Sequence, residues 1–150
     1  MTKITPHIWF DDCAEEAAQF YVETFRDGRL INVMRPGGAG KAIAVVFELF
    51  GQHFTGINGG PTYALTPAVS FHVPCESQQE IDLYWDRLAD RGQELRCGWV
   101  TDRFGVTWQI IPAEFPRLLG GDPQKAARVM GAAREMRKID LAALRAAAEG

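Results

Sequence analysis

A single glutamine interrupts an otherwise apolar stretch in the second half of the chain. Gln109 lies between Trp108 and Ile110 in CGWVTDRFGVTWQIIP, a pattern that predicts two strands joined by a tight turn. A side-chain amide offers two donors and an acceptor, so in a pocket it can orient a carbonyl or hydroxyl group of a ligand. A hydrogen-bonding role in the core or at an interface explains the same residue, and both interpretations stay open.

The three histidines are the next candidates for chemistry. His7 lies in ITPHIWF and could contact a ligand or a metal, although a hydrogen-bonded strand histidine is the alternative. His53 abuts a turn and His72 lies close to Pro74, so we regard both as weaker candidates.

The cysteines favour a structural role. They are odd in number and widely spaced, at Cys13, Cys75 and Cys97. This pattern is typical of reduced thiols in a cytoplasmic protein, and it does not resemble a disulfide framework or a cysteine-rich zinc site. We expect small buried side chains, with Cys13 set apart because it falls at a predicted helix N-terminus, where a thiolate is favoured.

An internal repeat indicates which elements position these residues. ITPHIWF (4–10) and LTPAVSF (65–71) match in register, and each precedes a predicted helix. Asp12 with Glu15 predicts the N-cap of the first helix, and Ser77 with Glu80 predicts that of the second. Three predicted strands follow each helix. The sequence therefore predicts two βαβββ modules, about 4–58 and 65–112, divided at the turn-forming NGGP.

Two such modules can be paired to enclose a cup lined by the sheet faces that lie opposite the helices. Because side chains alternate along a strand, Trp9 shares the face of His7, and the residues between them pack under the helix. GQHFTGI aligns with GVTWQII, and the repeat aligns the two modules' first strands. The predicted pocket residues are His7, Trp9, Thr55, Ala68 and Gln109, with His7 matching Ala68 and Thr55 matching Gln109.

The segment 113–150 lies outside the repeat and predicts a helical extension. Asp122 followed by Pro123 predicts the start of one helix, and Asp140 predicts the start of a second. The first of these helices has an apolar face, which we expect to pack against the body of the domain or a second copy of it: Val129, Met130, Ala133 and Met136. The predicted domain boundaries are thus 1–112 and 113–150.

The composition excludes several classes of function. The 150 residues are 47% hydrophobic and 23% charged, with a net charge of −3, which is typical of globular proteins. No basic face is expected to hold a phosphate backbone, so nucleic acid is not a predicted partner. The first ten residues lack an apolar run of signal-peptide length, and no stretch approaches the roughly 18 apolar residues of a membrane span. We expect a cytoplasmic protein with no membrane partner.

Long motifs in order carry a family resemblance. The stretches ITPHIWFDDCAEEAAQFY, FTGINGGP, TPAVSFHV and CGWVTDRFGVTWQIIP resemble the PhnB-like family. That family is also labelled the 3-demethylubiquinone-9 3-methyltransferase domain, and it belongs to the vicinal oxygen chelate (glyoxalase/bleomycin-resistance) superfamily. The resemblance runs from Ile4 to about Pro112 and continues through the tail. It implies an α+β fold of paired βαβββ modules and a homodimer.

The resemblance also implies where a metal would bind. Metal-using members of the superfamily supply one ligand, His or Glu, from each of four strands. Here those positions fall on His7, Thr55, Ala68 and Gln109, of which His7 is a good ligand and Gln109 a weak one. We therefore predict a protein that binds a small organic molecule without a metal or other cofactor.

Two enzymatic functions are alternatives to this prediction. In the first, Glu48 or a residue of a partner chain completes a site around His7, which would give a metal-dependent isomerase, lyase or dioxygenase of the superfamily. The second is the methyltransferase of the family label. It is not expected, because the sequence lacks a glycine-rich strand-to-helix loop with a downstream acidic residue.

Overall fold

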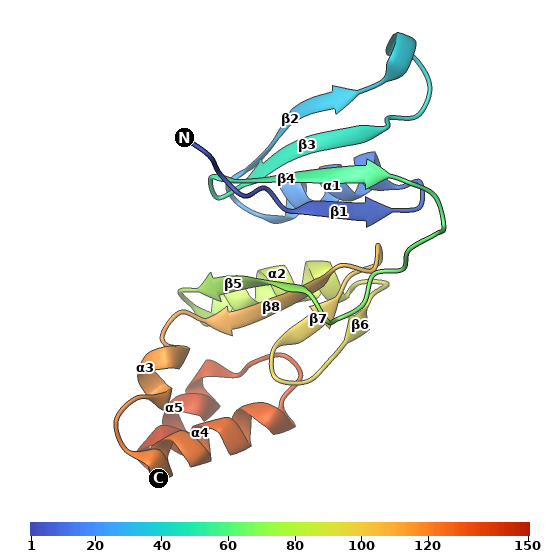
Figure 1. Ribbon diagram of the computed structural model, residues 1–150. Coiled ribbons are helices and arrows are strands. Elements are labelled where there is room, and N and C mark those ends of the chain that lie inside the picture. The colour runs from blue at the N-terminus through green and yellow to red at the C-terminus, as the bar shows by residue number, and fades with distance from the viewer. The chain divides into compact units, whose positions relative to one another are not determined.

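The computed structural model describes residues 1–150 and divides into two compact units, Met1–Leu65 and Thr66–Gly150. Each unit contains a four-stranded sheet with one helix on one face, and the second unit carries three further helices (Figure 1). The α+β class and the βαβββ order of each unit confirm the predicted fold. No helix has the length and apolar character needed to cross a bilayer.

The first unit packs one long helix on its sheet. The sheet order is β1-β4-β3-β2, with β1 parallel to β4 and the other pairs antiparallel. Phe47 stacks on Phe54 with ring centroids 5.3 Å apart, and Tyr21 of the helix lies 5.8 Å from Phe47, so aromatic rings fill this core. The elements are β1 (His7–Phe10), α1 (Ala14–Thr24), β2 (Gly28–Met34), η1 (Pro36–Gly38), β3 (Ala44–Leu49) and β4 (Gln52–Asn58).

The start of α1 differs from the prediction. The helix begins at Ala14, and the predicted cap residue Asp12 instead forms an ion pair with Lys41 at 2.5 Å. The amide of Ala14 donates to Asn58 Oδ1 at 2.9 Å, and Asn58 Nδ2 donates to the carbonyl oxygen of Ala42 at 2.9 Å. The Asp12 cap was wrong because the acceptor comes from the end of β4, 44 residues away, where no local pattern could show it.

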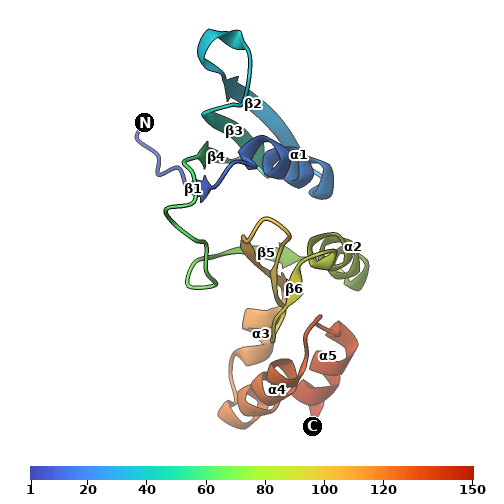
Figure 2. The same cartoon turned by 90° about the vertical axis from the view of Figure 1, so that its right-hand side faces the viewer.

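The second unit repeats the arrangement, with α2 over one face of the sheet (Figure 2). Its strand order is β5-β8-β7-β6, with β5 parallel to β8. Ser77 caps α2 as predicted, because its Oγ accepts from the amide of Glu80 at 3.2 Å. The elements are β5 (Ser70–Cys75), α2 (Gln78–Ala89), β6 (Gln93–Glu94), β7 (Trp99–Thr101) and β8 (Thr107–Pro112).

The start of β5 corrects the predicted match between the two modules. Ala68 lies in an exposed turn, and the strand begins only at Ser70. In the first sheet His7 is paired with Thr55, and in the second sheet Gln109 is paired with His72. The structural counterpart of His7 is therefore His72. The prediction was wrong because the shared Thr-Pro precedes β1 directly, whereas Ala68 and Val69 separate it from β5.

The C-terminal helices α3 (Phe115–Leu119), α4 (Pro123–Glu135) and α5 (Leu141–Glu149) belong to the second unit. Asp122 and Asp140 cap α4 and α5 as predicted, through hydrogen bonds to the amides of Gln124 at 2.9 Å and Ala143 at 3.0 Å. The short helix α3 was not predicted.

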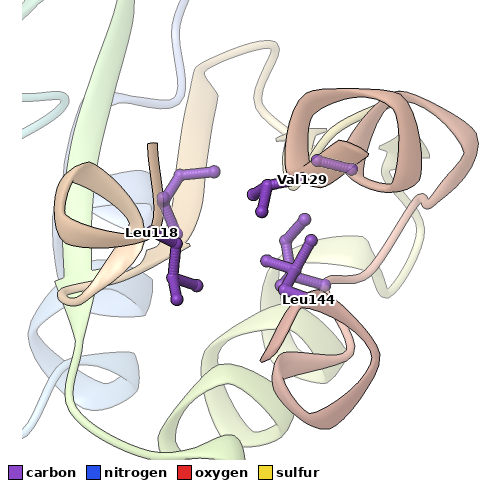
Figure 3. Close-up of a cluster of buried hydrophobic side chains, with 6 residues drawn as sticks. Leu118, Val129 and Leu144 are labelled. Carbon is purple, nitrogen blue, oxygen red and sulfur yellow. The ribbon is translucent and has the colours of Figure 1, made fainter. Parts of the chain in front are cut away.

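The tail shares a hydrophobic core with β8. Figure 3 shows the six buried side chains of this tail cluster: Ile111, Leu118, Val129, Ala133, Ile139 and Leu144. Two residues of the predicted apolar face, Val129 and Ala133, are central to it; Met136 packs on its edge and Met130 lies outside. Gln78 of α2 adds polar contacts, donating to the carbonyl of Ile139 at 3.0 Å and accepting from the amide of Leu141 at 2.8 Å. The predicted face therefore packs on the chain's own second module.

Candidate ligand-binding site

Two predicted site residues meet on the first sheet, on the face opposite α1. His7 on β1 is exposed and is the pairing partner of Thr55 on β4, which is buried. Residues paired across neighbouring strands point to the same face of a sheet. Ile8 and Phe10 are buried on the α1 side, so the predicted alternation along β1 is confirmed.

Trp9 lies on the face of His7, where it holds the segment that follows β4. Its Nε1 donates to the carbonyl oxygen of Gly60 at 2.8 Å, and its ring meets Tyr63 edge-on with centroids 4.9 Å apart. A Cβ atom added at Gly59 would lie 2.3 Å from the Trp9 ring, so only glycine fits there. The structure thus gives this predicted pocket residue a clear packing role.

A charged group occupies another part of the same face. Glu48 on β3 bonds Arg29 Nε at 3.0 Å and His53 Nε2 at 2.7 Å. The Arg29 hydrogen bond, assisted by His53, holds the pKa of Glu48 below its usual range. Glu48 is the pairing partner of His53, whereas Thr55, beside His7, is paired with Val46. The carboxylate predicted as an alternative metal ligand is therefore already engaged by Arg29 and His53.

On the second sheet, Gln109 lies on the face opposite α2. Its neighbours in the chain, Trp108 and Ile110, are buried on the α2 side. Gln109 Nε2 donates to Ser70 Oγ at 2.8 Å, and its pairing partners are His72 on β5 and Trp99 on β7. The interpretation of Gln109 as a hydrogen-bonding strand residue is thus supported, and the amide oxygen takes no part in this bond.

The sequence analysis did not identify the other residues of this face. Ser70 and Trp99 flank Gln109, and Thr101 Oγ1 lies 2.8 Å from Thr107 Oγ1 across the β7–β8 pair. Ala68 is not among them, because its turn precedes the strand. The signal that could have found β5 is the Ser77 cap, since counting back from it places SFHVPC directly before the helix.

The donor set of neither unit alone fits a transition metal. The first unit brings His7 beside a threonine hydroxyl, and the second brings His72 beside the amide of Gln109. Zinc sites use three or four nitrogen, sulfur or carboxylate ligands, and no group of three His, Cys, Asp or Glu side chains with suitable geometry occurs in the chain. No catalytic step through a metal follows from these residues.

The cysteines form no disulfide, and the two in the second unit are unreactive in character. Burial raises the pKa of the Cys75 thiol to about 12, and the nearby carboxylates of Glu80 and Glu76 add to the shift. Burial likewise raises the pKa of Cys97, which packs against the tail cluster. Both thiols are therefore protonated near neutral pH.

The family model described as 3-demethylubiquinone-9 3-methyltransferase matches residues 2–111. The chain belongs to this PhnB-like family. The matched segment covers both βαβββ modules and ends before α3, so the three C-terminal helices lie outside it. A search of curated proteins gave no significant match.

Solved structures agree with this family. A putative 3-demethylubiquinone-9 3-methyltransferase, the PhnB protein from Bacillus cereus, is 33% identical; the alignment covers 72% of this chain and 97% of that chain, with a TM-score of 0.66. Protein PA1353 from Pseudomonas aeruginosa is 18% identical over 72% and 95% of the two chains, with a TM-score of 0.62. A possible glyoxalase from Bacillus cereus is 17% identical over 72% and 96%, with a TM-score of 0.52. The last two show a shared fold.

Proposed function

We propose that this PhnB-like protein binds a small organic molecule on the sheet faces opposite α1 and α2, without a metal. The observation that carries the proposal is the amide of Gln109 on the face opposite α2, held by Ser70 beside the half-buried Trp99. An ordered amide next to an aromatic ring provides directional hydrogen bonding and apolar contact, the two features that small-molecule sites combine.

Native mass spectrometry of the purified full chain tests this function directly, because it reports a retained ligand, a bound metal and the number of subunits together. We expect a retained organic molecule, no stoichiometric metal, and a homodimer of the kind that the family resemblance implies. A metal-free protein that retains nothing, and whose melting temperature rises with no member of a metabolite library, would contradict the proposal.

Gln109→Leu is the matching variant, since it keeps the side-chain volume nearly constant and removes the amide. A ligand hydrogen-bonded to Gln109 should lose about 1–3 kcal/mol of binding free energy. Isothermal titration of the ligand identified by mass spectrometry would measure the difference. Equal ligand affinities of the native protein and the variant would mean that Gln109 has a purely structural role.

A metal-dependent enzyme of the superfamily is the second candidate, and one observation favours it. The pairing of His72 with Gln109 matches that of His7 with Thr55, so the two modules carry an imidazole at equivalent positions. The sequence repeat had matched His7 with Ala68 and therefore indicated only one imidazole. Elemental analysis separates the candidates. About one tightly held metal per subunit, lost in both His7→Ala and His72→Ala, would make the enzyme the better explanation.

The methyltransferase activity in the family's name is not proposed for this chain. The connection from β1 to α1 is Asp11–Cys13 and that from β5 to α2 is Glu76–Ser77, and neither contains glycine. Nucleotide-like cofactors usually bind at a glycine-rich turn between a strand and a helix.

A further inference from the structure

The face of Gln109 is polar but carries no fixed charge. Strand pairing places nine side chains of four adjacent strands on it: Ser70, His72, Pro74, Gln93, Trp99, Thr101, Thr107, Gln109 and Ile111. None of the positions in register with Gln109 on β5, β6, β7 or β8 is Asp, Glu, Lys or Arg. The corresponding face of the first sheet differs, because it carries the ion pair of Glu48 with Arg29 and the hydrogen bond between Glu48 and His53.

The hydrogen bonds within this face determine which polar atoms remain for a ligand. One N–H of Gln109 Nε2 donates to Ser70 Oγ, and the hydroxyls of Thr101 and Thr107 hydrogen-bond each other. The carbonyl oxygen of the Gln109 amide is therefore an acceptor that a ligand can use, and the second N–H of the same amide remains as a donor beside it. Trp99 is paired with Gln109 and is half-buried, so it adds a flat apolar surface beside that acceptor.

We propose that the part of the ligand lying on the second sheet is a flat, uncharged organic group that donates a hydrogen bond to Gln109 Oε1. This inference rests on the proposed ligand-binding function. Placing an ionised group on a partly desolvated face without an opposing charge is unfavourable, whereas a neutral N–H or O–H donor completes the hydrogen bonding of the amide. The proposed class is thus aromatic or conjugated amides and neutral hydroxy compounds.

Four probes of similar size test the class on the full, isotope-labelled chain. Benzamide is neutral and a donor, acetophenone is neutral without a donor, benzoate is an anion, and benzamidinium is a cation. Titrations would be followed by NMR through the Gln109 side-chain amide and the Trp99 indole N–H. We expect benzamide to bind most tightly and acetophenone roughly 3- to 10-fold more weakly, because one neutral hydrogen bond is lost. Both ions should bind at least about tenfold more weakly than benzamide.

Variants connect these preferences to Gln109. Gln109→Leu should remove the difference between benzamide and acetophenone, and Gln109→Glu should shift the preference to benzamidinium by supplying a negative charge. Gln124→Leu makes the same chemical change as the first variant on the exposed start of α4 and should leave all four affinities unchanged.

The outcomes separate the two proposals. Benzoate or benzamidinium binding as tightly as benzamide would overturn the neutral-donor class while leaving ligand binding intact, and so would a benzamide preference that survives in Gln109→Leu. If none of the four probes shifts the Gln109 and Trp99 resonances up to its solubility limit, the neutral-donor class is overturned, and the native mass spectrometry and the metabolite library decide separately whether the chain binds another organic molecule.

Discussion

Thr55 and Gln109 show how similar positions acquire different roles through single contacts. Both lie next to a histidine on the parallel neighbouring strand, His7 and His72 respectively. Thr55 is buried, whereas Gln109 is half-buried and bonds Ser70. The sequence predicted the face and the alternation of both residues correctly. The sequence analysis missed the Ser70 contact, because the Thr-Pro repeat suggested too early a start for β5.

Cys75 gives a prediction about pH at the residue scale. Its pKa is about 12 in the folded protein and 9.0 in the reference state. The folded state therefore keeps its proton over a pH range in which the unfolded chain loses it. The contribution of Cys75 to stability is present in full below pH 9.0 and declines as pH rises toward 12.

The measurement is the free energy of unfolding by urea at pH 8, 9 and 10, at the lower end of this range. We expect stability to fall more steeply with pH in the native sequence than in Cys75→Ala, whose other titrating groups are the same. Parallel slopes for the two proteins would mean that the thiol ionises equally in both states.

At the scale of elements, patterns local in sequence were predictable and contacts distant in sequence were not. The Ser77, Asp122 and Asp140 caps all follow from residues within three positions of the helix start. The cap of α1 comes from Asn58, and β5 starts later than the Thr-Pro repeat suggested. In both failures a plausible local motif was present, but tertiary contacts decided the outcome.

The α1 cap leads to a prediction that separates the two candidate residues. Asn58→Ala removes the acceptor for the Ala14 amide and the donor to the Ala42 carbonyl, both in partly buried surroundings. We expect a loss of about 1–3 kcal/mol in the free energy of unfolding. Asp12→Ala is the matched control, since it removes an exposed ion pair with Lys41 and should cost much less. Urea denaturation of both variants provides the comparison, and a larger loss in Asp12→Ala would restore the sequence-based cap.

At the scale of the whole molecule, the extension beyond the family segment is built into the second unit. Residue Ile111 of β8 lies on the face of Gln109 by alternation, and it belongs to the tail cluster with Leu118 and Leu144. The tail therefore covers the end of the strand that carries the proposed site. The sequence predicted the apolar face of α4, but it did not show whether this face packs on the domain body or on a second copy of the chain. An apolar stripe does not identify the surface that covers it.

Deleting Asp122–Gly150 tests this role of the tail. The deletion removes Val129, Ala133, Ile139 and Leu144 and exposes Ile111 and Leu118 to water. We expect lower solubility, a lower melting temperature, and faster amide hydrogen exchange in β8 and α2, with exchange in β3 and β4 of the first unit unchanged.

Leu144→Ala in the full chain is the milder variant. Because Leu144 is fully buried, this change should lower the free energy of unfolding by about 2–5 kcal/mol. Leu83→Ala changes an exposed leucine on α2 and serves as its control, with a much smaller expected loss. A core shared with β8 cannot be removed without destabilising that strand. A truncated protein that stays soluble and melts at the original temperature would therefore contradict the proposed role of the tail cluster.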